Sequence, residues 1–149
     1  MSAFRALLFA SSLTLLAACH EQTTQATQEP TAPTGPQCYT HSTATDTIRL
    51  TLQTTQPTVT GQLTYHYFEK DRNQGTIRGV MHGDTLLADY TFQSEGTTSV
   101  RQVAFLRRDI GFIEGFGPVV ERQGKLLFEQ PRTLQYDAKY TLIPVPCPK

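Results

Sequence analysis

Apolar and polar residues alternate along much of the chain, in short stretches that turn residues separate. Ile48, Leu50 and Leu52, for example, alternate with polar neighbours, and the same period of two recurs through residues 59–116. A period of two is typical of β-strands with one buried face. No stretch combines a helical period with helix caps. The chain is therefore predicted to be all-β.

The turn residues predict how neighbouring strands pair. If Gly83-Asp84 forms a two-residue hairpin turn, the strands on either side place their apolar residues on one face of the sheet. The expected pairs are Ile77 with Tyr90, Gly79 with Ala88, and Met81 with Leu86. This agreement supports the register, because a slip of one residue would move every side chain to the opposite face.

The next two hairpins extend the same register. Centring the first on Glu95-Gly96 pairs Leu86 with Phe105, Ala88 with Val103, and Tyr90 with Arg101. Centring the second on Arg108-Asp109 pairs Phe105 with Phe112, Val103 with Glu114, and Arg101 with Phe116. Four consecutive strands then share one inner face.

Further strands complete the predicted sheet. A strand over residues 61–67 precedes a charged turn over residues 69–75, and strands over residues 126–128 and 136–145 follow Gly117-Pro118. Short strands at regular spacing predict an antiparallel meander of about seven to eight strands, folded as a closed barrel or a barrel-like sandwich. We favour the barrel, because closure removes exposed strand edges.

Polar side chains on the inner face form a candidate ligand pocket. Arginine suits an anionic group, and a small-molecule pocket is typically apolar with a few convergent polar groups. The candidate residues are Arg101, Glu114, Tyr90, Tyr65 and Tyr67. The alternative is structural, with Arg101 and Glu114 forming a buried ion pair in a barrel that its own side chains fill.

An apolar row crosses the outer face of the same four strands. Its residues are Val80, Leu87, Ala104 and Ile113. An apolar stripe on a face otherwise exposed to water usually has a partner, so this row is a candidate surface for another protein. The alternative cover is the chain's own carboxy-terminal part, which offers Leu134, Tyr136, Leu142 and Ile143.

Residues 1–18 have the organisation of a signal peptide. Arg5 precedes an apolar run over residues 6–18, which is too short to remain as a membrane-spanning helix. The run ends in Leu16-Ala17-Ala18-Cys19, which resembles the lipobox of bacterial lipoproteins. This resemblance implies that Cys19 is lipidated, for instance with palmitate, and anchors the mature protein to a membrane. The alternative is an ordinary signal peptide with a chance cysteine after it.

The residue after the lipobox bears on location. His20 stands there instead of aspartate, which by analogy with lipoprotein sorting favours the outer membrane of a bacterial cell envelope. The sequence does not decide whether the protein faces the periplasm or the outside of the cell.

Residues 19–37 are predicted to be the lipidated cysteine and a flexible tether. This segment is rich in Thr, Gln, Ala and Pro, and it has too little apolar surface to offset the entropy of ordering. Cys38 and Cys147 stand at the two ends of the part that follows, and in an oxidising compartment such a pair predicts a disulfide. A zinc site is the weaker alternative, because no pair of histidines stands nearby. Residues 38–149 are therefore predicted to be a single barrel-like domain.

Composition and motifs narrow the function classes. The 149 residues carry no net formal charge, so nothing favours a nucleic-acid partner. The chain has no nucleophile elbow, no His-Glu-x-x-His motif and no phosphate-binding glycine loop. We therefore expect no enzymatic activity, no cofactor and no metal.

Two sequence blocks carry a second resemblance. YFEKDRNQGT at residues 67–76 and DYTFQSEG at residues 89–96 are similar to a group of small β-rich envelope lipoproteins, which implies a shared domain and brings no catalytic residues. We expect a membrane-anchored, non-catalytic binding module for a small ligand or a partner protein. The alternatives are an inhibitor of a cell-wall-degrading enzyme, an envelope hydrolase that uses Glu114 with a second carboxylate, and a structural module of an envelope assembly.

Overall fold

The computed structural model describes residues 35–148, apart from residues 71, 95 and 110. Within this part the chain forms ten β-strands and one short 3₁₀ turn, η1. The elements are β1 (Gln37–Ser42), β2 (Thr47–Thr54), β3 (Val59–His66), β4 (Asn73–His82), β5 (Thr85–Ser94), β6 (Thr97–Arg108), β7 (Gly111–Phe116), β8 (Val119–Arg122), β9 (Lys125–Phe128), η1 (Pro131–Thr133) and β10 (Gln135–Val145). The predicted all-β class is confirmed.

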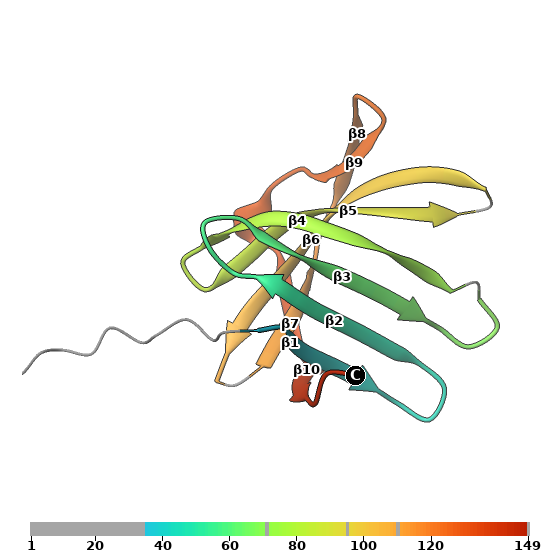
Figure 1. Ribbon diagram of the computed structural model, residues 1–149. Helices are drawn as coiled ribbons and strands as arrows, with labels where there is room; N and C mark the ends of the chain where they lie inside the picture. Colours follow the sequence, from blue (N-terminus) through green and yellow to red (C-terminus); the bar gives the residue numbers. More distant parts are fainter. Residues whose placement is uncertain (1–34, 71, 95, 110, 149) are drawn as a thin grey trace, which may run out of the picture. The chain divides into compact units, whose positions relative to one another are not determined.

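Eight of these strands close into an antiparallel barrel (Figure 1). They follow one another around the wall in the order β5, β4, β3, β2, β1, β10, β7 and β6, and the pairing of β5 with β6 closes the ring. The β8–β9 hairpin is an addition outside the ring, where β9 runs parallel to the first half of β6. The prediction of a closed barrel is thus confirmed, although β1 and not β9 is the eighth wall strand.

The core fills the inside of the barrel with the side chains that the alternation assigned there. On β2 and β3 these are Ile48, Leu50, Leu52, Val59, Leu63 and Tyr65, all of which are buried. The same cluster includes Ile77 of β4, Leu86 and Tyr90 of β5, and Phe105 of β6. Burial of one face of each strand is the main stabilising contribution in a barrel of this kind.

The first two predicted hairpins have the expected register. Ile77 pairs with Tyr90 and Met81 with Leu86 across β4 and β5, and Leu86 pairs with Phe105 across β5 and β6. Gly83, at the first of these turns, has φ +60, a value that suits glycine because it has no Cβ. A tight turn therefore determined the pairing of two long strands.

In the third predicted hairpin, each residue of β6 pairs with a residue of β7 two positions later than predicted. Phe105 pairs with Glu114 and Arg107 with Phe112, so the turn is centred on residues 109–110. A shift of two residues keeps every side chain on its predicted face, since side chains alternate with a period of two. Arg101 and Glu114 therefore both face inward, although the predicted pairs of Val103 with Glu114 and of Arg101 with Phe116 do not form.

Other boundaries also differ from the prediction. β4 begins at Asn73, so the strand takes up the last part of the charged segment that was predicted to be a turn. Strands β1 and β8 were not predicted, because they are short and lack a clear alternation of apolar residues.

The outer row is only partly continuous. Val80 pairs with Leu87 and Leu87 with Ala104, as predicted, but Ala104 then pairs with Gly115, while Ile113 pairs with Leu106. Ala104 and Ile113 are buried, whereas Val80 is exposed.

The chain's own carboxy-terminal part covers one end of this row. A Cβ at Gly115 would meet the ring of Tyr136, and a Cβ at Gly117 would meet Leu134. The two other residues considered as a cover do not serve: Leu142 is buried in the barrel core, and Ile143 is exposed. This favours the chain itself, and not another protein, as the cover at the Ala104–Gly115 end.

The disulfide is present and joins the two ends of the domain. Cys38 and Cys147 have Cα atoms 5.2 Å apart, and Cys38 lies on β1 beside Val145 of β10. The bond therefore reinforces the seam between the first and last strands of the barrel. The predicted signal peptide, Cys19 and most of the predicted tether lie outside the described residues.

Candidate functional site

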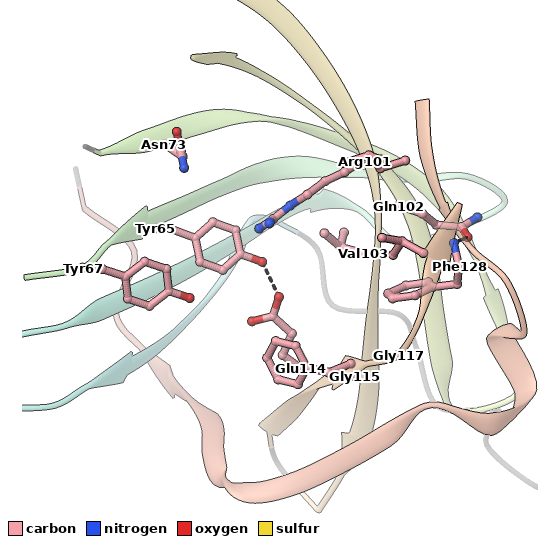
Figure 2. Close-up of a pocket in the computed structure, with 13 residues that line it drawn as sticks. Tyr65, Tyr67, Asn73, Arg101, Gln102, Val103, Glu114, Gly115, Gly117 and Phe128 are labelled. Atoms are coloured by element: carbon pink, nitrogen blue, oxygen red, sulfur yellow. Dashed lines mark hydrogen bonds between the residues drawn. The ribbon is translucent and has the colours of Figure 1, made fainter. Parts of the chain in front are cut away.

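The barrel wall opens between β6 and β7. β7 pairs with β6 only from Ala104 to Arg108, and the neighbour of Arg101 on that side is Leu126 of β9. A cavity of about 260 Å³ lies at this gap. It is lined by Tyr65, Tyr67, Asn73, Arg101, Gln102, Val103, Glu114, Gly115, Phe116, Gly117, Val119, Leu126 and Phe128 (Figure 2).

Glu114 is the buried carboxyl group of this site. Its side chain points inward from β7, with only 4% of the residue exposed. The Tyr65 hydroxyl donates a hydrogen bond of 2.5 Å to Glu114 Oε1, and Figure 2 shows the two side chains facing each other across the barrel. Glu114 Oε2 is buried and has no hydrogen-bond partner.

Burial controls the ionisation of this carboxyl. Removal from water raises the pKa of Glu114 from 4.5 to about 7, and the Tyr65 hydrogen bond and the charge of Arg101 oppose the rise. Glu114 is therefore neutral in acidic solution and exchanges its proton near neutral pH. A neutral carboxyl donates a hydrogen bond, whereas a carboxylate only accepts.

Arg101 extends from β6 toward Tyr65 (Figure 2). Its Cζ lies 4.8 Å from the ring centroid of Tyr65, 5.5 Å from that of Tyr90 and 5.7 Å from that of Phe92. Aromatic faces attract a guanidinium group, so these rings hold the cation in place. Arg101 Nε is buried without a hydrogen-bond partner.

Arg101 and Glu114 share the cavity but form no ion pair with each other. The described ion pairs are all on the surface, and they join Arg107 to Asp84, Lys125 to Asp89, and Lys139 to Asp137. The alternative of a satisfied Arg101–Glu114 pair is therefore not what the structure contains. Each of the two side chains therefore still has a buried polar atom without a hydrogen-bond partner, Arg101 Nε and Glu114 Oε2.

Three tyrosines surround the two charged groups. Burial raises the pKa of Tyr67 and of Tyr90 to about 12, and that of Tyr65 well above its usual value, so all three hydroxyls stay protonated. Of the five residues predicted to form a pocket, all but Tyr90 line the cavity. Tyr90 instead packs beside Arg101, and its buried hydroxyl has no hydrogen-bond partner.

The mouth of the cavity is apolar. Phe116, Val119 and Leu126 line it and are 45%, 48% and 43% exposed, respectively. They come from the end of β7 and from the β8–β9 hairpin. The predicted register placed Phe116 on the inner face beside Arg101. No signal in the sequence could have placed Val119 and Leu126 there, because the position of the hairpin depends on contacts with the distant strand β6.

The described residues also limit the chemistry of the site. Glu114 is the one carboxyl group among the described residues that line the cavity, and Asp89 lies on the outer face, paired with Lys125. Across the described ranges, no cluster of three or more His, Cys, Asp or Glu residues could hold a metal ion. In the described ranges, no helix is long and apolar enough to cross a membrane.

Comparison with known proteins provides no assignment. Neither a protein-family model, nor a curated protein, nor a solved structure matches this chain.

Proposed function

We propose that this chain is a lipid-anchored lipoprotein of the bacterial envelope, and that its barrel is a non-catalytic binding module for a small anionic ligand. Arg101 would hold the anionic group, with Glu114, Tyr65 and Tyr67 around it. The observation that carries the proposal is the set of unsatisfied polar atoms: Arg101 Nε and Glu114 Oε2 are buried beside a cavity and have no hydrogen-bond partner.

Unsatisfied buried groups make a ligand the simplest explanation of this site. Each such atom costs about 1–3 kcal/mol of stability, more when it is charged, and buried polar groups in folded proteins nearly always have partners. A ligand with an anionic oxygen would supply a partner for Arg101. The cavity of about 260 Å³ is slightly smaller than the usual range of about 300–1,000 Å³ for drug-sized ligands, so the enclosed part of the ligand must be small.

The membrane anchor is supported by the sequence. The apolar run and the Leu-Ala-Ala-Cys motif resemble a lipoprotein signal, and a disulfide at the domain ends suits an oxidising envelope compartment. We place the protein at the outer membrane on the basis of His20. The anchor is tested by fractionation: Cys19→Ser should move the protein from the membrane to the soluble fraction, and persistence of the variant at the membrane would refute lipidation.

The lack of a second carboxyl in the cavity supports a binding role over a glycosidase role. A two-carboxylate mechanism needs a pair of carboxyl groups at a separation of roughly 5–9.5 Å. Glu114 has no such partner among the described residues that line the cavity. A neutral Glu114 serves instead as a hydrogen-bond donor to a bound anion.

Thermal denaturation with simple anions tests the binding proposal. We expect butyrate at pH 6 to raise the melting temperature of the wild-type chain by several degrees, because a ligand that binds only the folded state stabilises it. Arg101→Met should melt cooperatively and lose this protection. The matched control is Arg108→Met, which removes an exposed arginine from the same strand and should keep the full shift.

The outcomes are distinct. If butyrate, benzoate and inorganic phosphate all leave the wild-type melting temperature unchanged, the cavity is not an anion site. If Arg101→Met does not fold while Arg108→Met does, Arg101 has a structural role, and the Arg101→Lys variant becomes the test. A folded lysine variant that butyrate does not protect still supports the proposal. A folded lysine variant with full protection contradicts a specific role for the guanidinium group.

A further inference from the structure

We infer that the ligand is amphipathic: a carboxylate carried on an apolar chain, with the carboxylate at Arg101 and the chain leaving through the mouth of the cavity. This inference rests on the proposed function and adds the chemical class of the ligand. It comes from the change in polarity between the inner end of the cavity and its mouth.

The inner end is polar, and the mouth is apolar. Glu114 and Tyr65 are almost fully buried inside the barrel, and Arg101 reaches toward them from β6 (Figure 2). In the described part of the chain, the exposed large hydrophobic residues are Phe68, Val80, Phe116, Val119, Leu126 and Ile143. Half of these six line this one cavity. Scattered exposed apolar residues are ordinary, but a group of them around the entrance to a polar cavity indicates a binding surface.

The β8–β9 hairpin is fixed so that its apolar side chains line the cavity. Arg101 and Leu126 are neighbours in the parallel ladder between β6 and β9, so Leu126 shares the face of the sheet that Arg101 occupies. The preceding residue, Lys125, forms a 2.6 Å ion pair with Asp89 on the outer face. The Phe128 backbone N–H also donates a 3.1 Å hydrogen bond to Gln102 Oε1. These contacts hold an apolar residue at the entrance although it is not needed to close the barrel.

The inner end suits a monoanion. Arg101 contributes one positive charge, and Glu114 contributes none when it is protonated. A carboxylate therefore neutralises the site, and its planar pair of oxygens matches the planar guanidinium group. A phosphate dianion would leave an uncompensated negative charge close to the Glu114 carboxyl, which is unfavourable in a buried site.

The size of the cavity places the apolar chain at the mouth. At about 260 Å³ it is too small to enclose a carboxylate together with a long chain. The chain would instead lie against Phe116, Val119 and Leu126, which would remove their apolar surface from water. Two sources fit this chemistry: a fatty acid, and the carboxy-terminus of a peptide whose last side chains are apolar.

Titration calorimetry at pH 6 with ligands of different chain length tests the inference. The full chain carries Cys19→Ser so that no detergent is required. We expect decanoate to bind at least ten times more tightly than butyrate, and decanol to bind much more weakly than decanoate. N-acetyl-Leu-Leu, compared with N-acetyl-Gly-Gly, forms the peptide arm. If decanoate gains more affinity over butyrate than N-acetyl-Leu-Leu gains over N-acetyl-Gly-Gly, the ligand is a fatty acid. The opposite result identifies the carboxy-terminus of a peptide.

Rim variants locate the chain. Leu126→Ser and Val119→Ser should each weaken decanoate binding several-fold and leave butyrate binding unchanged. Ile143→Ser is the matched control, because Ile143 is an exposed aliphatic residue away from the cavity, and it should change neither affinity. All three positions are exposed, so the variants should fold, which the melting temperature verifies.

The inference and the proposed function can fail separately. If butyrate binds and decanoate and N-acetyl-Leu-Leu show no gain, the site is an anion site and the amphipathic ligand is wrong. Equal binding of decanol and decanoate would also overturn the inference. If no carboxylate binds at all, the proposed function fails together with it.

Discussion

Two parts of the barrel wall differ in how far their strands pair. β4 pairs with β5 at eight positions and β5 with β6 at ten, so this part of the wall is continuous. β6 pairs with β7 at only five positions, all in the second half of β6. On the amino-terminal side of Ala104 the two strands separate, and the β8–β9 hairpin lies beside the first half of β6 instead.

The difference shows how a filled barrel can also hold a site. Where the ladders are continuous, the inner side chains, such as Leu63, Ile77 and Leu86, pack into a core with almost no exposure. Where the ladder ends, Arg101 and Glu114 lie beside a cavity and keep unpartnered polar atoms. The continuous wall therefore provides stability, and the interrupted wall provides the binding capacity that we propose.

The largest predicted effect concerns the seam between β1 and β10, where the Cys38–Cys147 disulfide adds a covalent link to the strand ladder. Reduction of the Cys38–Cys147 disulfide, whose residues are 109 positions apart, should lower the free energy of unfolding by about 4 kcal/mol, because the unfolded chain gains entropy. Urea denaturation with and without reductant measures this. The Cys38→Ser/Cys147→Ser variant is the control and should not respond to reductant. A loss below about 1 kcal/mol would mean that the strand ladders alone hold the seam.

The second prediction tests the continuous wall. Leu63 is fully buried on β3, so Leu63→Ala should lower the free energy of unfolding by about 3 kcal/mol through lost burial and the resulting cavity. Chemical denaturation gives the value. A cost below about 1 kcal/mol would show that this side of the barrel packs no better than the open side.

The third prediction uses the ionisation of Glu114 on the interrupted side. The pKa of Glu114 is raised by burial from 4.5 to about 7, so the folded state binds the proton more tightly than the unfolded state. The resulting stabilisation is complete below pH 4.5 and is lost as the pH rises to about 7. Its full size is on the order of 3 kcal/mol.

The measurement compares unfolding free energies of the wild type and Glu114→Gln between pH 4 and pH 8. The difference between the two proteins should change over pH 4.5–7 in the direction of a less stable wild type at higher pH. Glutamine keeps an oxygen that accepts the Tyr65 hydrogen bond, so it is a conservative control. If the two proteins respond to pH in parallel, Glu114 is not held neutral by burial.

The smallest predicted effect concerns the mouth of the cavity. Leu126 is exposed on β9, outside the barrel ring, so Leu126→Ala should change the free energy of unfolding by less than about 0.5 kcal/mol. The contrast with Leu63→Ala is the sharpest test of the comparison, because the two substitutions are chemically the same. Equal costs would show that the hairpin is an integral part of the core.

Part of the fold could be predicted because it depends on local signals. Gly83-Asp84 is a two-residue turn, so the pairing of Ile77 with Tyr90 followed from counting outward. The third hairpin failed because no glycine marks its turn: Arg108-Asp109 and the centre that the chain uses, residues 109–110, both lack one, and Asp109 takes the positive φ of 48 instead. The candidate site survived this error because a shift of two residues preserves the face of every side chain.

The sequence by itself determined which face of strands β2 to β6 is buried, the register of the tight hairpins, the cysteines available for a disulfide, and the presence of Arg101 and Glu114 on the inner face. Only the tertiary structure decided that β1 joins β10 to close the ring, that β9 lies beside β6, and that Tyr65 and not Arg101 bonds to Glu114. The physical reason is the range of the interactions. Alternation and turn geometry act between neighbours in the chain, whereas closure and the cavity depend on contacts between residues far apart in sequence, such as Tyr65 and Glu114.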